Sequence, residues 1–262
     1  MLFYPLFSGS SGNASLLEAG DVRILIDAGV TGSALTRALC EIGVDPKSVS
    51  AILITHEHSD HIHGAGVFSR KYDVPVYANK GTWEGMRSCV GNIAPHNVRV
   101  FETNRDFYIH NVNITPFKTP HDALESVGYR IDFNGKRLAV MTDIGVAEPC
   151  LLDAVDGADL LLIEANHDVD MLKSGSYPYV LKRRILSDVG HLSNESAGKA
   201  LAKLYLRGLR RAILGHLSLD NNLEELALET VREILRGEDI SDAAFELTVA
   251  HRDRLTGRYE VV

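Results

Sequence analysis

The chain has 262 residues, 45% of them hydrophobic, and a formal net charge of -8 at pH 7. This length and apolar content are enough to bury a sizeable core, and with only 8 prolines they exclude an extensively disordered chain. The negative charge disfavours broad binding to a phosphate backbone, which depends on Lys and Arg. We expect one domain over residues 1–262.

The cysteines and the N-terminus indicate a cytoplasmic protein. Cys40, Cys89 and Cys150 are far apart and odd in number, so they suggest neither a disulfide framework nor a thiolate zinc site. The apolar stretch at residues 2–7 has no basic flank, and no apolar run approaches the roughly 18 residues of a membrane span. We therefore expect three inert thiols and no membrane partner.

Strand and helix patterns alternate along the chain. Apolar runs predict strands at residues 22–27, 49–54, 112–117, 127–133, 137–142, 159–163 and 211–214. Asn134-Gly135 is typical of a hairpin turn. Helical periodicity, with Ser193 as a cap and Gly237 as a stop, predicts helices at residues 32–41, 61–72, 148–154, 194–206 and 223–235. Strands in hairpins and beside helices indicate sheets covered by helices, an α/β fold.

A dense group of possible metal ligands follows the second predicted strand. Residues 56–61 read HEHSDH. Neutral imidazole and carboxylate are ligands that zinc, iron and manganese accept, and two ligand pairs so close together can hold two ions side by side. Taken alone, such a segment is as readily a histidine-rich surface loop. The prediction of a dinuclear metal site therefore depends on partners elsewhere in the chain.

Such partners stand at the ends of other apolar segments. His121, Asp143 and His216 each follow a predicted strand, and Asp27 ends an earlier one. With these residues the chain resembles the metallo-β-lactamase superfamily, whose motifs run Asp, HxHxDH, His, Asp, His. All five occur in that order between residues 27 and 216. The resemblance implies a four-layer αββα sandwich with the metals at one sheet edge.

The resemblance also assigns the ligands. It implies two ions with shared and separate ligands: His56, His58 and His121 for the first, Asp60, His61 and His216 for the second, and Asp143 between them. Asp27 would instead fix the histidine loop. Two ions about 3.5 to 4 Å apart lower the pKa of a shared water, so a bridging hydroxide, oriented by Asp60, is the expected nucleophile. Manganese, zinc and iron all remain open.

Two further residues narrow the reaction. Glu164 and His191 precede His216 in the order found in the phosphodiesterase branch of the superfamily, notably ribonuclease Z. The resemblance implies that His191, held by Glu164, donates a proton or hydrogen bond to the phosphate. A structural polar pair is the alternative. The chain lacks the long inserted arm that grips transfer RNA in ribonuclease Z, which argues against transfer RNA processing.

Three short segments carry a closer resemblance. SGSSGN at residues 8–13, NHD at 166–168 and GHLS at 190–193 resemble the YycJ/VicX (WalJ) group of bacterial proteins. That resemblance covers nearly the whole chain and implies a manganese-activated 5′-to-3′ exonuclease acting on DNA ends, with a link to mismatch repair. Ser11, Asn13 and His167 are the candidate substrate-binding residues, although residues 8–13 are equally typical of a plain hairpin loop.

Basic residues give only local support for a nucleic-acid partner. Lys199, Lys203, Arg207 and Arg210 lie at helical spacing, and KRR at residues 182–184 precedes His191. Such stripes are more often solvated faces than binding sites. Bound metals would add positive charge at the cleft.

The sequence therefore predicts a dinuclear metal-dependent phosphodiesterase, and more narrowly a 5′-to-3′ DNA exonuclease, with Asp60, Glu164 and His191 as catalytic residues. The alternative is a small-molecule hydrolase, either a glyoxalase II-like thioesterase or a cyclic phosphodiesterase. Lactam hydrolysis is disfavoured because Asp143 stands where common metallo-β-lactamases have a zinc-binding Cys. A binding protein that kept the fold and lost turnover is a third interpretation, against which the complete ligand set argues.

Overall fold

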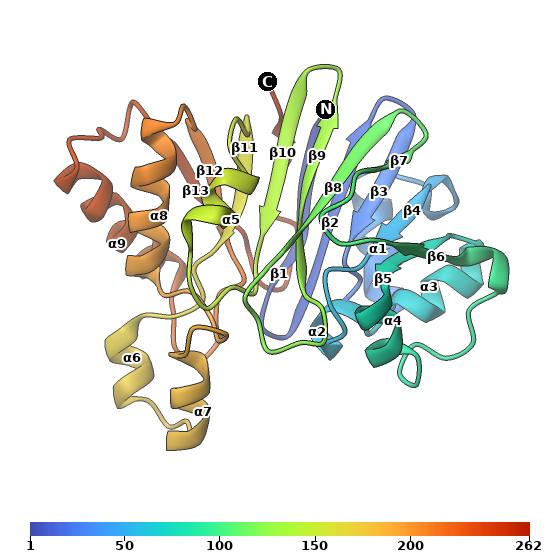
Figure 1. The fold of residues 1–262 in the computed structure, drawn as a ribbon, viewed down its shortest axis with the longest axis horizontal. Helices are drawn as coiled ribbons and strands as arrows, with labels where there is room; N and C mark the ends of the chain where they lie inside the picture. Colours follow the sequence, from blue (N-terminus) through green and yellow to red (C-terminus); the bar gives the residue numbers. More distant parts are fainter.

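The computed structural model describes residues 1–262 and contains two seven-stranded sheets packed face to face (Figure 1). The strand order is β14-β1-β2-β3-β4-β5-β6 in the first sheet and β13-β12-β11-β10-β9-β8-β7 in the second. None of the helices has the length and apolar character that crossing a membrane requires.

The first sheet begins with hairpins and continues with parallel strands. Its strands are β1 (Leu2–Gly9), β2 (Gly12–Ala19), β3 (Val22–Ile26), β4 (Ala51–Leu53), β5 (Val76–Asn79), β6 (Val98–Phe101) and β14 (Tyr259–Glu260). Strands β1 to β3 pair antiparallel, whereas β3 to β6 pair parallel because helices connect them. The connecting helices are α1 (Gly32–Glu41), α2 (Ser59–Ile62), α3 (Ala65–Tyr72) and α4 (Lys80–Met86), with short 3₁₀ turns at Pro46–Ser48 and Pro95–Asn97.

The second sheet repeats this plan. Its strands are β7 (Phe107–Ile109), β8 (Val112–Lys118), β9 (Val127–Phe133), β10 (Lys136–Met141), β11 (Leu160–Glu164), β12 (Arg211–Gly215) and β13 (Glu246–Val249). Strands β7 to β10 form antiparallel pairs, and β10 to β13 pair parallel. The intervening helices are α5 (Pro149–Ala154), α6 (Val169–Ser174), α7 (Tyr179–Ile185), α8 (Asn194–Leu206) and α9 (Glu224–Gly237). Figure 1 shows α6 and α7 standing apart from the other helices.

Alternating side chains divide the core into three apolar layers. On β3, Ile24 and Ile26 pack in the cluster between the two sheets, while Leu25 packs in the cluster that includes Leu35 of α1. On β11, Leu161 joins a third cluster with α8 and α9. Because successive strand residues point to opposite faces, each sheet is covered by the other sheet on one face and by helices on the other. The predicted four-layer αββα architecture is confirmed.

Most predicted elements are confirmed within two residues, and β9, α1 and α8 have the predicted bounds. The turn at Asn134-Gly135 is also confirmed, with φ of 50° and 73° at its two residues. The single helix predicted at residues 61–72 is wrong, because α2 and α3 are separate. A Cβ at Gly64 would lie 2.3 Å from the carbonyl oxygen of Val30, so the chain bends there to pass close to the loop after β3.

Candidate metal centre

The candidate site lies where strands of both sheets end at one edge. Strands β3 and β4 are parallel, and so are β10, β11 and β12. The carboxyl ends of parallel strands meet at a common edge, which gathers side chains from distant parts of a chain. Here the strand ends lead to the predicted site residues Asp27, 56–61, His121, Asp143, Glu164 and His216.

Three of these residues leave their strands in an unusual backbone conformation. Asp27, Asp143 and His216 have φ of 60°, 55° and 56°. Positive φ is uncommon for non-glycine residues and persists only where the surroundings fix it. The sharp turn at each position aims the side chain into the space beyond the strand end. Such outliers cluster at functional sites, and these three meet in one place.

Three imidazoles converge at the first predicted metal position. His56 Nε2 lies 3.0 Å from His58 Nδ1, and His121 Nε2 lies 3.2 Å from the same nitrogen. Burial, reinforced by the neighbouring histidines, lowers the pKa of His56 well below its usual value. That ring is therefore neutral and offers a lone pair. Three converging imidazole nitrogens are a donor set that divalent metals accept.

Carboxylates and two more imidazoles form a second group beside the first. Asp60 Oδ2 lies 3.4 Å from both His61 Nε2 and His216 Nε2. Asp143 Oδ2 lies 3.3 Å from His61 Nε2, while Asp143 Oδ1 lies 3.4 Å from His216 Nε2 and 3.7 Å from His121 Nε2. Asp143 therefore reaches histidines of both groups.

One oxygen of this bridging carboxylate shows that the site fits a cation. Asp143 is buried, and its Oδ2 has no hydrogen-bond partner. A buried carboxylate oxygen without a partner is costly. A divalent cation would satisfy that oxygen and the surrounding imidazoles together, so the residues present fit a divalent metal.

The local field also favours positive charge. Burial lowers the pKa of His216, but Asp143 and the other carboxylates outweigh it and raise that pKa to about 10. Burial also lowers the pKa of His61, but Asp143, Asp27 and Asp60 outweigh it and raise that pKa well above its usual value. Without a metal, these rings therefore hold protons near neutral pH. Metal binding would displace those protons.

A layer of protein acceptors fixes the histidine rings. The ring nitrogens that face away from the site bond to protein groups: His56 Nδ1 to Thr55 Oγ1 at 3.0 Å, His61 Nδ1 to Asp27 Oδ2 at 2.8 Å, His121 Nδ1 to the Gly190 carbonyl at 3.1 Å, and His216 Nδ1 to Glu164 Oε1 at 2.9 Å. Such contacts set the tautomer and leave Nε2 free toward the site. Asp27 lies in this layer, as the sequence predicts.

Glu164 joins one of the clustered histidines to a second, more exposed one. Its Oε1 accepts from His191 Nδ1 at 2.7 Å as well as from His216, and its Oε2 accepts from the backbone N–H of Ile144 and Leu192 at 2.9 and 3.1 Å. Glu164 itself is fully buried. Burial lowers the pKa of His191, but the Glu164 carboxylate outweighs this effect and raises it. His191 is therefore held in one orientation and favours its protonated form.

A polar cavity of about 280 Å³ opens over these groups and brings in Ser10 and Arg184, which the sequence marks only through the SGSSGN segment and the KRR run. Its lining contains no hydrophobic residue and includes Asp60, Asp143 and His191, together with Ser10 and Arg184. Arg184, on α7, forms a two-point ion pair with Asp122, the neighbour of His121. It is the only Lys or Arg on the cavity wall. The one sequence signal for it is the KRR run, in which Lys182 instead donates to carbonyls at the end of α6.

The three predicted substrate-binding residues occupy different positions. Residues 8–13 form the end of the β1–β2 hairpin, with Ser11 exposed in its turn. Asn13 is buried, and its Nδ2 lies 3.1 Å from His61 Nε2 and 3.3 Å from Asp60 Oδ2, so it supports the candidate ligands. Ser8 also supports them, because its Oγ accepts from the backbone N–H of His216 at 2.9 Å.

His167 does not have the exposure that substrate contact requires. It is 1% exposed, and neither ring nitrogen has a hydrogen-bond partner. Burial lowers its pKa to about 4, so the ring is neutral. The prediction that His167 binds substrate therefore disagrees with its position, because the chain folds over the ring. Of residues 166–168, Asn166 is the one that contacts a candidate metal ligand, because its Nδ2 donates to the His216 carbonyl at 2.9 Å.

Comparisons with known proteins agree with this geometry. Residues 22–217 match the model of the beta-lactamase superfamily domain. The chain is 41% identical over 233 residues to the exodeoxyribonuclease YycJ of Bacillus anthracis, covering 89% of this chain and 88% of that protein. It is 43% identical over 237 residues to the exodeoxyribonuclease WalJ of Streptococcus pneumoniae, covering 90% and 88%. Human tRNase Z, short form, has a similar fold, with a TM-score of 0.67 and 18% identity over the full length of both chains.

Proposed function

The chain belongs to the beta-lactamase superfamily and is a hydrolase, and from this we propose that it is an exodeoxyribonuclease that works with two divalent metal ions and digests DNA from the 5′ end. The observation that carries the proposal is the extent of the likeness to the two exodeoxyribonucleases. It runs along about nine-tenths of each chain rather than through the metal motifs alone.

The donor set supports a pair of ions. In our proposal His56, His58 and His121 hold one ion, Asp60, His61 and His216 hold the other, and Asp143 contacts both. Bound there, two divalent ions supply an activated water and positive charge for the phosphate. Manganese is the activator that we favour, with zinc as the alternative and iron compatible with the same ligands.

The positive charge of Arg184 makes the cavity suitable for binding a phosphodiester. A guanidinium on the cavity wall can neutralise a phosphate oxygen through charge-assisted hydrogen bonds. The pair with Asp122 holds Arg184 in place while leaving part of its fork of donors available. The wholly polar lining favours a phosphodiester over the acyl thioester of a glyoxalase II-like enzyme.

In our proposal, His191 assists departure of the leaving oxygen. Because Glu164 accepts from Nδ1, the remaining donor is Nε2, on a ring that lines the cavity. A protonated His191 would donate from Nε2 to the leaving oxygen, while Glu164 stabilises the charged ring. Glu164 acts as a positioning residue in this scheme, because both its oxygens are used within the protein.

Digestion of end-labelled polymers tests the proposal. Metal-stripped protein is given Mn²⁺ or Zn²⁺ and incubated with single- and double-stranded DNA and RNA labelled at either end, with Asp143→Ala prepared in parallel. We expect stepwise release of nucleotides from the 5′ end of DNA, and none from the variant. If wild-type protein with its metal content intact cleaves no polymer, the substrate is instead a small thioester or cyclic phosphodiester.

A further inference from the structure

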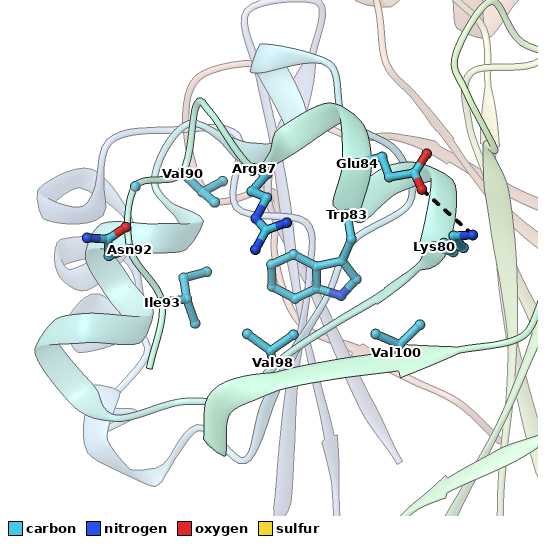
Figure 2. Close-up of a pocket in the computed structure, with 10 residues that line it drawn as sticks. Lys80, Trp83, Glu84, Arg87, Val90, Asn92, Ile93, Val98 and Val100 are labelled. Atoms are coloured by element: carbon cyan, nitrogen blue, oxygen red, sulfur yellow. Dashed lines mark ion pairs between the residues drawn. The ribbon is translucent and has the colours of Figure 1, made fainter. Parts of the chain in front are cut away.

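A second cavity, of about 360 Å³, lies between α4 and the edge strand β6, and it shares no residue with the polar cavity at the metal centre (Figure 2). Its walls are mainly apolar: Trp83 from α4, Val90 and Ile93 from the following loop, and Val98 and Val100 from β6. Figure 2 shows these side chains gathered around one hollow, with Arg87 reaching over it. The volume is within the range of about 300 to 1,000 Å³ common for ligand sites.

The apolar wall is open to solvent. Val100 is 63% exposed, and Trp83 and Ile93 are only partly buried. Single exposed apolar residues are ordinary, but a mainly apolar hollow with a few polar groups at its rim is the usual form of a binding site. This one is rimmed by Lys80, Glu84 and Arg87.

The indole of Trp83 restricts how a partner binds here. Strand β6 is the edge of the first sheet and pairs only with β5, so a partner strand would normally be able to add to it. Trp83 Nε1 donates to the carbonyl of Arg99 in β6 at 2.9 Å. Because that carbonyl already accepts a hydrogen bond, it cannot pair with an added strand at this point. The hollow itself, rather than the strand edge, is the feature that can receive a partner's side chain.

The charged side chains at the rim of the hollow favour a negatively charged binding partner. Arg87 forms no ion pair. Lys80 lies 3.9 Å from Glu84, with side-chain exposures of 85% and 65%, and such exposed pairs are easily separated. The hollow thus presents two available cations on a chain whose net charge is -8. Carboxylates complement that rim.

The chemistry of the wall distinguishes a peptide from a nucleobase. Sites for unpaired bases stack them on aromatic faces. Here one indole stands among four aliphatic side chains, a lining that suits a large apolar amino-acid side chain.

We propose that this cavity binds an acidic peptide segment of a partner protein, which inserts one large apolar side chain beside Trp83 and Val100 while its carboxylates contact Lys80 and Arg87. The proposal goes beyond the hydrolytic activity, since it assigns a docking site to a face that the metal centre does not use. A partner bound there would leave the catalytic cavity open to substrate.

Trp83 reports on the proposed binding directly, because it is the only tryptophan in the chain. The probe is a synthetic peptide of four alternating Asp and Glu residues followed by Leu-Phe, titrated into the full-length, metal-loaded protein without DNA. We expect a saturable change in Trp83 emission, with a dissociation constant in the micromolar range. Peptides with Ser-Ser in place of Leu-Phe, or Lys in place of the acids, should bind at least tenfold more weakly.

Variants of the rim and wall locate the effect. Arg87→Glu and Val100→Asp should each weaken peptide binding at least tenfold. Lys80→Glu should weaken it less but measurably, whereas Lys199→Glu, a lysine in the same i,i+4 arrangement with a glutamate on α8, should leave it unchanged. Circular dichroism and metal content show whether each variant is folded, and DNA digestion by the Lys80, Arg87 and Val100 variants should match wild type.

Three results would overturn the proposal. One is the absence of a saturable response, and another is equal binding of acidic and basic peptides. The third is displacement of the peptide by a single-stranded oligonucleotide whose own binding is lost in Arg87→Glu, which would assign the cavity to nucleic acid. Because the peptide titrations use no DNA cleavage, their outcome is independent of the exonuclease proposal.

Discussion

The two sheets contribute unequal halves to the metal centre. The first sheet supplies Asp27 and the continuous loop over residues 56–61, whereas the second supplies single residues from the ends of separate strands. Each half has one buried carboxylate behind its histidines. Asp27 accepts from His61 and from Thr55, and Glu164 contacts both His216 and His191.

The different contacts of these two buried carboxylates indicate that the two sheets have different roles in the site. The carboxylate of the first sheet only orients a candidate ligand. The carboxylate of the second sheet connects a candidate ligand to a histidine that is 19% exposed in the catalytic cavity. We infer that the first half builds the metal site and that the second half also carries proton transfer and substrate charge.

We expect the largest effect on catalysis from replacing His191, a histidine that the second sheet contributes to the cavity. His191→Gln should lower kcat by about 10²- to 10⁴-fold, the usual contribution of a general acid. Metal content, measured by elemental analysis, should equal that of wild type because His191 is not among the proposed ligands. A loss of less than tenfold would mean that the leaving oxygen needs no help from this ring.

The two carboxylates give a matched comparison. Asp27→Asn and Glu164→Gln should each weaken metal affinity by about 10- to 100-fold, as expected when a group behind a ligand is changed. At saturating metal, Asp27→Asn should recover most of its kcat, whereas Glu164→Gln should remain low because His191 has lost its orienting charge. Metal titrations followed by initial rates measure both effects. Equal recovery of the two variants would contradict the division of tasks.

Arg184 extends the comparison to substrate binding, since it lies in the segment between β11 and β12. Arg184→Ala should raise KM about tenfold and reduce the salt dependence of DNA binding by about one counterion. Arg183→Ala is the control, because that exposed neighbour does not line the cavity. Rates and binding at several salt concentrations measure both variants, and identical behaviour would remove the role proposed for Arg184.

The buried ring of His167, which lies in the segment after β11, should make the free energy of unfolding depend on pH. Its pKa is about 4 in the folded chain and about 6.5 when unfolded, so the unfolded state alone takes up a proton between these values. Wild-type stability from this residue is therefore lost as pH falls from about 6.5 to 4, by about 2 kcal/mol at pH 5. His167→Met lacks this loss.

Urea denaturation of both proteins in chelator at pH 7.5 and 5 measures the difference. At pH 7.5 the replacement should change the free energy of unfolding by about 1 kcal/mol or less, because the imidazole makes no hydrogen bond. A pH-independent difference between the two proteins would show that His167 is not buried as a neutral ring.

Local patterns were sufficient for the elements with strong periodicity. Helix α8 has the predicted bounds, and Ser193 caps it by accepting from Ser196 N–H. Strand β1 was not predicted, because Pro5 interrupts its pattern, and the sheet accommodates that residue with a register shift between Pro5 and Phe7. Strands β5 and β6, with four residues each, and helices α6 and α7, with six and seven, are too short to show a period and depend on their neighbours.

The candidate ligands were found because they follow strands in a family motif, and the structure brings them together. Their roles in metal binding remain a prediction. The sequence marks Arg184 only as part of the KRR run and Ser10 only as part of residues 8–13, because their positions at the cavity depend on how α7 and the β1–β2 turn meet the strand ends. His167 shows the converse, since a segment that matches a motif can still turn its side chain inward.

The hydrogen bond between Ser8 Oγ and the backbone N–H of His216 has a consequence for synthesis of the chain. The two residues are 208 positions apart, so the contact closes a long loop of the chain. At about 5 to 20 residues per second, the ribosome makes them roughly 10 to 40 s apart. For most of that interval the nascent chain contains residues 56–61 but not yet His216. We infer that the enzyme stays inactive until His216 has been synthesised and has left the ribosome.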